Sequence, residues 1–288
     1  MSLVASLPSP TDLVELPFMR TALLELALLA VAGGLLGAWI VLRRLAFFAH
    51  AVGTATFPGL VVADATGFSA TLAGLAVALG YAGGVERAGR ADRDPGDVAT
   101  ALALVVALAL GVVLASDVFE SGAAVDRLLF GTALGLDGGD LWLAAGVAAL
   151  ALAATLLLGR AWTTVGFDDS AAGSLGLPVR TADLLLLGLI GVAAVAALPA
   201  VGALLVASLF VVPAATARQL TDTVAGLLAV SVAIAAAQGA IGLYVSLWLD
   251  VPPGPAVAVV GSGLYALVAG TCAFGRRSRA VPLAAEAT

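Results

Sequence analysis

Residues 43–64 read RRLAFFAHAVGTATFPGLVVAD and place the only histidine of the chain, His50, inside an apolar run. An ionisable side chain at bilayer depth costs free energy unless it is paired, so it indicates a functional site. Thr54 follows four residues later, on the same face of a helix. Pro58 and Gly59 are predicted to end this helix early. The stretch therefore predicts a short, broken helix with polar groups, of the kind that lines pathways in membrane proteins. A hydrogen-bonded packing role for His50 stays open.

The composition is that of a membrane protein. The chain has 288 residues, of which 61% are hydrophobic and 11% charged, and its mean hydropathy is +1.11. Since apolar runs of about 20 residues can cross a membrane, we predict an all-α, polytopic transmembrane helical bundle of about eight or nine spans, short broken helices included. The predicted spans are residues 21–42, 46–63, 68–85, 98–115, 141–158, 182–198, 201–212, 224–249 and 256–274.

The chain is predicted to form one membrane domain, at residues 18–275, with a cytoplasmic connection at residues 160–181. Residues 1–17 form a polar, irregular segment outside the membrane in this prediction, and residues 276–288 a cytoplasmic tail. The first 17 residues contain no arginine or lysine, so they lack the basic region of a cleavable signal peptide.

The charges are distributed unevenly between the two sides of the predicted spans. All 13 basic residues are arginines, and all except Arg20 and Arg127 fall in connections on one side. The positive-inside rule makes that side cytoplasmic. The opposite connections are acidic and would concentrate cations, although outer loops that are merely poor in arginine are an alternative explanation.

The same composition excludes several function classes. A P-loop ATPase needs the lysine of its phosphate-binding loop, and this chain has no lysine. The arginines form no stripe, so no nucleic acid partner is predicted. The single cysteine, Cys272, excludes an internal disulfide and a cysteine-rich metal site.

A few polar and aromatic residues within the spans have simpler roles. We expect Glu25 to reach the nearby interface by snorkelling and Gln238 to form an interhelical hydrogen bond. Tryptophans near the span ends predict an aromatic belt at both interfaces. These are Trp142 and Trp248 at the outer ends, and Trp39 and Trp162 at the inner ends.

The connection at residues 160–180, RAWTTVGFDDSAAGSLGLPVR, is a long polar segment on the cytoplasmic side. Asp168 or the aspartate after it can cap a short helix that ends at Gly176, ahead of Pro178. An exposed short helix between two spans predicts a docking element for a partner.

Four stretches resemble motifs of the membrane subunits of ATP-binding-cassette importers for zinc, manganese and iron. Residues 43–59 resemble the family's RR and GDALSHAxLPG, and residues 167–179, FDDSAAGSLGLPV, resemble FDPELARALGLPV. Residues 201–217 resemble VGxLLVxALLxxPAATA, and residues 242–257 resemble GLYxSxxLDxPxGPxI. Asp97 with Ala99 and Phe130 with Gly131 also fit the family's DxA and FG positions, so the resemblance covers about residues 18–270.

The resemblance implies a fold of the vitamin B12-importer type and a role as a permease in the cell membrane. Its implied partners are separate ATPase subunits, a second permease subunit, identical or a close paralogue, and an external metal-binding protein. The chain itself would be no enzyme and hold no cofactor: a divalent metal ion is the cargo, and the partner uses the ATP. The implied ATPase-coupling residues are Phe167, Asp168, Ala171, Ala172, Leu175, Gly176 and Pro178.

The implied metal path departs from the family at two positions. The family's aspartate falls on His50 and its histidine on Thr54. Imidazole suits zinc, copper, iron and nickel, whereas carboxylate-rich sites suit manganese. His50 and Thr54 are therefore the predicted metal-path residues, and they favour zinc.

Two alternatives remain open at this point. One is import of a larger metal chelate, such as a siderophore or a vitamin, which would favour a wide apolar cavity over ligands. The other is an ion-coupled secondary transporter without an ATPase, which would need more buried carboxylates than Glu25 alone.

Overall fold

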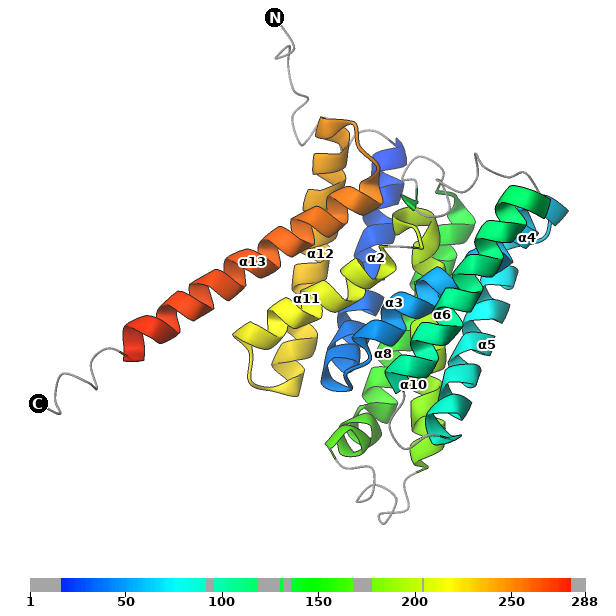
Figure 1. Ribbon diagram of the computed structural model, residues 1–288. Coiled ribbons are helices and arrows are strands. Elements are labelled where there is room, and N and C mark those ends of the chain that lie inside the picture. Colours follow the sequence, from blue (N-terminus) through cyan, green and yellow to red (C-terminus); the bar gives the residue numbers. More distant parts are fainter. Residues whose placement is uncertain are drawn as a thin grey trace, which may run out of the picture.

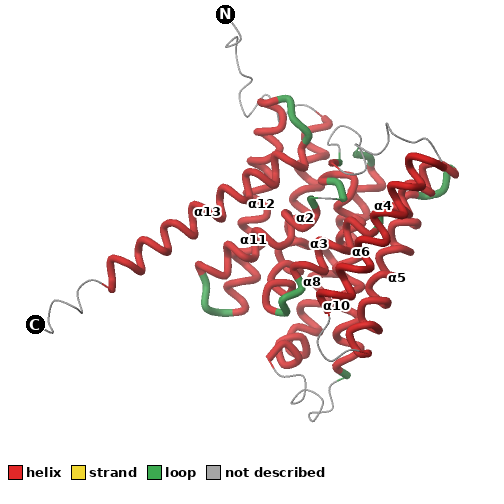
Figure 2. Tube along the Cα trace, in the orientation of Figure 1, coloured by secondary structure: helices red, strands yellow, loops and turns green. Residues whose placement is uncertain are grey.

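The computed structural model describes residues 17–91, 96–118, 130–131, 136–167, 178–203 and 205–280, and all regular secondary structure within these residues is helical (Figures 1 and 2). The elements are α2 (Pro17–Leu42), α3 (Ala46–Ala55), α4 (Phe57–Thr66), α5 (Ala70–Ala91), α6 (Gly96–Val113), the π-helical turn η1 (Leu114–Val118), α8 (Gly138–Phe167), α10 (Val179–Val201), α11 (Val206–Leu220), α12 (Val224–Leu249) and α13 (Pro253–Ala280).

Eight of the nine predicted spans coincide with described helices. The ninth, residues 201–212, overlaps only the first half of α11, because α10 continues to Val201 and α11 extends to Leu220. In the described part of the chain, 7 helical segments are long and apolar enough to cross a membrane, one of them formed jointly by α3 and α4. The other two predicted spans are α11, a shorter apolar helix, and α5, which has 22 residues and carries Glu86 and Arg87 near its end. The prediction of an all-α transmembrane bundle is confirmed.

Helix α2 lies at the centre of the bundle and packs against α8, α10, α11 and α12 (Figure 1). Two glycines bring its backbone close to its neighbours. A Cβ at Gly34 would overlap the backbone of Val232 in α12, and one at Gly37 would overlap the carbonyl oxygen of Phe210 in α11. Small residues at helix crossings allow this close approach inside membranes.

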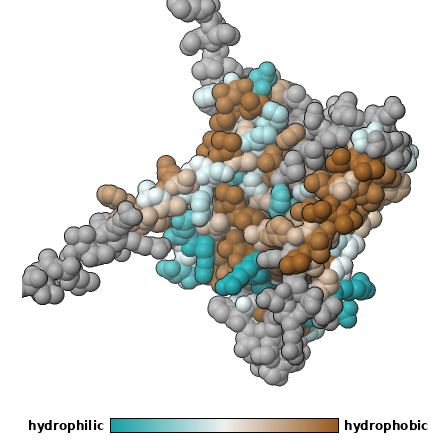
Figure 3. Space-filling model, in the orientation of Figure 1, coloured by the Kyte–Doolittle hydropathy of each residue, from teal (hydrophilic) through white to brown (hydrophobic). Residues whose placement is uncertain are grey.

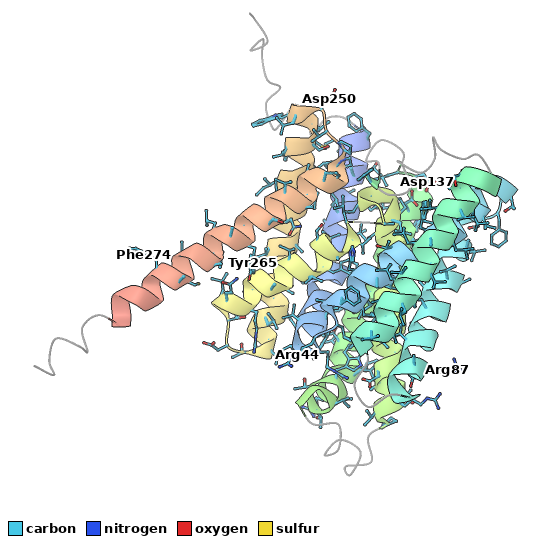
Figure 4. All side chains as sticks on the ribbon, viewed as in Figure 1. Arg44, Arg87, Asp137, Asp250, Tyr265 and Phe274 are labelled. Atoms are coloured by element: carbon cyan, nitrogen blue, oxygen red, sulfur yellow. The ribbon has the colours of Figure 1, made fainter. Side chains whose placement is uncertain are left out.

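The outer surface and the two ends of the bundle have the character expected of a membrane protein. Figure 3 shows a continuous hydrophobic face over α6, where Val106 is 66% exposed. Figure 4 shows Arg44 and Arg87 at one end of the bundle and Asp137 and Asp250 at the opposite end. This separation matches the asymmetry of the arginines, so the arginine-bearing end is the predicted cytoplasmic end.

The break in the helix at residues 46–66 lies earlier than predicted. The first half, α3, ends at Ala55, and Pro58 lies in the first turn of the second half, α4. A proline is tolerated there because its missing N–H would have no helical acceptor in any case. Pro58 therefore begins the second helix rather than ending the first.

Three predicted side-chain roles have different outcomes. Glu25 does not snorkel: it is fully buried within α2, and neither carboxylate oxygen has a hydrogen-bond partner among the described residues. Gln238 forms the predicted interhelical bond, since its Nε2 donates to the carbonyl oxygen of Ser208 in α11 at 3.1 Å. Trp142 and Trp248 are exposed at the outer ends as a belt requires, but Trp39 and Trp162 are buried against each other, with ring centroids 5.4 Å apart.

Candidate functional site

The helix that carries His50 begins at a tight reversal after α2. The N–H of Leu45 donates to the carbonyl oxygen of Ile40 at 2.8 Å, and Arg44 between them has φ 58°. This pattern is a Schellman cap, in which the left-handed position is usually glycine. The reversal brings α3 back into the bundle, where it packs against α6, α10 and α11.

His50 and Thr54 lie one turn apart on α3, as the sequence predicts, but they differ in exposure. His50 is half-buried, whereas Thr54 is 2% exposed. The Thr54 hydroxyl donates to the carbonyl oxygen of His50 at 3.2 Å. The imidazole is therefore the accessible polar group of the pair, and the hydroxyl is engaged within its own helix.

The end of α3 is held in place by its own backbone and by the connection between α10 and α11. The Thr56 hydroxyl donates to the carbonyl oxygen of Gly53 at 2.6 Å, at the point where α3 gives way to α4. A Cβ at Gly53 would lie 3.1 Å from the carbonyl oxygen of Ala203, so the two backbones nearly touch. The polar part of the broken helix thus lies against a second irregular segment.

Within the described residues, no three side chains of histidine, cysteine, aspartate or glutamate come together to hold a metal. His50 alone offers one imidazole nitrogen to an ion. A divalent metal passing His50 would need further ligands from water or from a second subunit.

Two of the predicted ATPase-coupling residues flank a segment that lies outside the described residues, and the other five lie within it. Phe167 ends α8, and Pro178 immediately precedes α10. Asp168, Ala171, Ala172, Leu175 and Gly176 lie outside the described residues, so the capped helix between α8 and α10 stays a prediction.

Three of the motif segments meet at the predicted outer end of the bundle, which the sequence did not indicate. A Cβ at Gly254, in the first turn of α13, would overlap the carbonyl oxygen of Val201 and would lie 2.6 Å from that of Phe130. Gly131 has φ 71° and lies against Val201 and Gly202. We call Phe130, Gly131, Val201, Gly202 and Gly254 the outer junction. It is a close backbone contact that requires glycine.

A comparison with protein families identifies the family of this chain. The model of the ABC 3 transport family matches residues 15–271. The chain belongs to the ABC 3 transport family. The matched region covers every described helix from α2 to α12 and most of α13, so the resemblance of the four motifs to metal-importer permeases is confirmed.

Two relatives of the chain are named for manganese. The manganese transport system membrane protein MntC of Halalkalibacterium halodurans is 31% identical over 262 residues, which cover 89% of this chain and 88% of that protein. The manganese import system permease protein ScaB of Streptococcus parasanguinis is 25% identical over 256 residues, which cover 89% of this chain and 91% of that protein.

A solved structure shares the fold of this ABC 3 family chain. A chain of PsaBC from Streptococcus pneumoniae in complex with Fab superposes with a TM-score of 0.80 at 23% identity, over 90% of this chain and 93% of that chain. A chain of an ABC transporter in an inward-facing conformation superposes with a TM-score of 0.71 at 17% identity. The chain is thus a multi-pass membrane protein with the fold of an ATP-binding-cassette permease.

Proposed function

We propose that the protein is the permease subunit of an ATP-binding-cassette importer for divalent transition-metal ions in the cell membrane. The observation that carries this proposal is the ABC 3 family match over residues 15–271, together with the broken helix that presents His50. Its relatives MntC and ScaB, which it matches over most of their length, are named as manganese permeases.

The driving force for transport comes from another polypeptide in this proposal. The chain has no lysine and so no P-loop of its own. A separate ATPase would act on the arginine-bearing end, where α8 ends and α10 begins. An external binding protein would deliver the metal to the acidic end that carries Asp137 and Asp250 (Figure 4).

A second permease subunit, either a copy of this chain or a close paralogue, would complete the metal path. Two facing copies would offer two imidazoles from His50 and no carboxylate from the helix at residues 46–55. This set favours a borderline ion such as zinc over manganese, which prefers carboxylate oxygens. Weak binding of this kind also suits transport, because an ion held tightly leaves slowly.

The test is ATP-driven uptake by the assembled importer. The permease is purified with the ATPase and binding protein encoded in neighbouring reading frames and is placed in lipid vesicles loaded with ATP. We expect radioactive zinc, manganese or iron to accumulate only when ATP and an ATPase with an intact P-loop lysine are present. Accumulation driven by an ion gradient in the absence of the ATPase would contradict the proposal and favour a secondary transporter.

A further inference from the structure

The predicted cytoplasmic end of the bundle contains an ion pair that connects distant parts of the chain. Nη2 of Arg43, in the turn between α2 and α3, lies 2.6 Å from Oδ1 of Asp183, in the first turns of α10. The side chains are 13% and 29% exposed. Because solvent screening is weak for such partly buried charges, this pair binds α10 to the turn that leads into α3.

The last turns of α8 belong to the same arrangement. The ring of Trp162 packs edge-on against that of Trp39 in α2, at an interplanar angle of 65°. Its Nε1 donates to the carbonyl oxygen of Ala182 in α10 at 2.9 Å. The inner ends of α8 and α10 are thereby connected to each other and to the end of α2.

The path of the Arg43 side chain depends on a glycine in α8. A Cβ at Gly166 would lie 2.8 Å from Cδ of Arg43, so a larger residue there would block the side chain on its way to Asp183. Nη1 of Arg43 is buried and has no hydrogen-bond partner in the part of the chain that the structure describes. Of the two terminal nitrogens of the guanidinium, Nη2 is therefore the one that is paired, with Asp183, among the described residues. We call Trp39, Arg43, Trp162, Gly166 and Asp183 the inner junction.

The inner junction is joined directly to the helix that carries His50. Arg43 and Leu45 both have their N–H groups bonded to the last turn of α2, at 2.9 and 2.8 Å. The N–H of Ala49 donates to the carbonyl oxygen of Leu45 at 2.9 Å, which joins the first turn of α3 to the same reversal. A shift of Arg43 cannot be absorbed by a loose loop and would move α3.

We propose that the Arg43–Asp183 ion pair transmits displacement of the inner ends of α8 and α10 to α3, and that Arg43 is a positioning residue for His50. This inference rests on the proposed function, since it needs an ATPase acting on that end of the bundle. The ion pair and the backbone hydrogen bonds of the reversal form a continuous series of contacts from α10 to α3, as a mechanical connection requires.

The experiment compares five variants in vesicles that contain the complete importer: Arg43→Gln, Arg43→Lys, Asp183→Asn, the double variant Arg43→Gln with Asp183→Asn, and Arg44→Gln as a matched control. Arg44 is the next residue and is exposed, so its loss removes the same cytoplasmic charge without touching the ion pair. The quantity measured is the number of metal ions taken up per ATP hydrolysed, together with the melting temperature of the purified complex.

We expect each single variant to lower the ions transported per ATP about tenfold while ATP hydrolysis stays within about twofold of the wild-type rate. The double variant should be no worse than either single variant, because both remove one interaction. Arg44→Gln should behave as wild type. Arg43→Lys should recover at least half of the coupling. The ion pair uses a single nitrogen of Arg43, which a lysine ammonium can replace, whereas a lysine could not replace a bidentate pair.

Three results would overturn the inference. One is normal uptake per ATP in both single variants. Another is an equal loss of uptake, hydrolysis and melting temperature without recovery in Arg43→Lys, which would make the pair a purely structural contact. The third is a double variant whose losses are the product of the two single losses. A wild-type importer with no ATP-driven uptake would instead contradict the proposed function.

Discussion

Glu25 is a carboxylate placed where the described part of the bundle offers it nothing to bind. It is fully buried in α2, and both of its oxygens lack hydrogen-bond partners among the described residues. A buried polar group without a partner costs about 1–3 kcal/mol, and a charged one costs more. A buried, unpaired carboxyl group is kept when it serves the function or when the rest of the fold is stable enough to tolerate this cost in free energy.

Replacing Glu25 should therefore stabilise the protein. We expect Glu25→Leu to raise the free energy of unfolding by about 1–3 kcal/mol, because it removes the unpaired acid from an apolar site. Glu25→Gln should give a smaller gain, since it keeps polar atoms at the same apolar site. Thermal unfolding in detergent measures both. A lower melting temperature for Glu25→Leu would show that the carboxylate has a stabilising partner.

Arg44 has a backbone conformation that is unfavourable for a residue with a Cβ. It has φ 58° at the Schellman cap of α2. A left-handed conformation costs a residue with a Cβ about 1–2 kcal/mol. Arg44→Gly should raise the free energy of unfolding by about 0.5–1 kcal/mol, after the greater chain entropy of glycine is subtracted. Arg43→Gly is the control and should lower it, because the ion pair with Asp183 is lost. A loss of stability in Arg44→Gly would assign the Arg44 side chain a contact of its own.

At the scale of the elements, the close approach of segments far apart in sequence is what holds the helices in their places. α13 contacts the connection before α8 and the last residue of α10 through Gly254 of the outer junction. The nearest atoms are backbone carbonyl oxygens, which cannot rotate away as a side chain does. The same helix carries Gly263, where, apart from its own turns of the helix, no atom of the described residues lies within 4 Å of the position that a Cβ would occupy.

These two glycines of α13 give a matched pair of variants. Gly254→Ala should lower the free energy of unfolding by about 1–3 kcal/mol, the usual cost of overpacking. Gly263→Ala should raise it by about 0.5–1 kcal/mol, because alanine favours the helix and meets no described neighbour. The melting temperatures of the two variants in detergent provide the comparison. Equal effects of the two substitutions would mean that the outer junction adapts to a methyl group.

The helices could be predicted from the sequence, but the contacts between them could not. Apolar length and the arginine pattern were enough to predict the described spans apart from the bounds of α11, because both follow from the membrane itself. The same residues could not show that Trp39 packs against Trp162, or that Arg43 pairs with Asp183, 140 positions along the chain. Such pairs depend on which helices become neighbours. The role of Glu25 was predicted wrongly for that reason, since neighbouring helices bury it. The helix break was predicted at Pro58 and Gly59 rather than at Thr56, where the hydroxyl bonds to the carbonyl oxygen of Gly53.

At the scale of the whole molecule, the distribution of the arginines predicts how the protein is oriented in the membrane. This orientation decides which end an ATPase can reach. The arginine-bearing end, with Arg44 and Arg87, should lie in the cytoplasm, and the end with Asp250 should lie outside (Figure 4). In a background without Cys272, a cysteine at position 250 should react with an impermeant thiol reagent in intact cells. A cysteine at position 169 should react only after the membrane is opened. Labelling of position 169 in intact cells would invert the orientation and remove the proposed ATPase site.

The central claim is that a divalent metal ion passes His50 on its way through an ATP-driven importer. The most direct measurement is uptake of radioactive zinc and manganese into vesicles with the complete importer, at matched amounts of protein. His50→Ala should lower zinc uptake at least tenfold, equivalent to about 1.4 kcal/mol, whereas Thr54→Ala should do less, because that hydroxyl is bonded to the carbonyl oxygen of His50. The double variant His50→Asp with Thr54→His should shift the preference toward manganese, since it adds a carboxylate. ATP-driven zinc uptake at the wild-type rate in His50→Ala would contradict the claim and place the path, or the cargo, elsewhere.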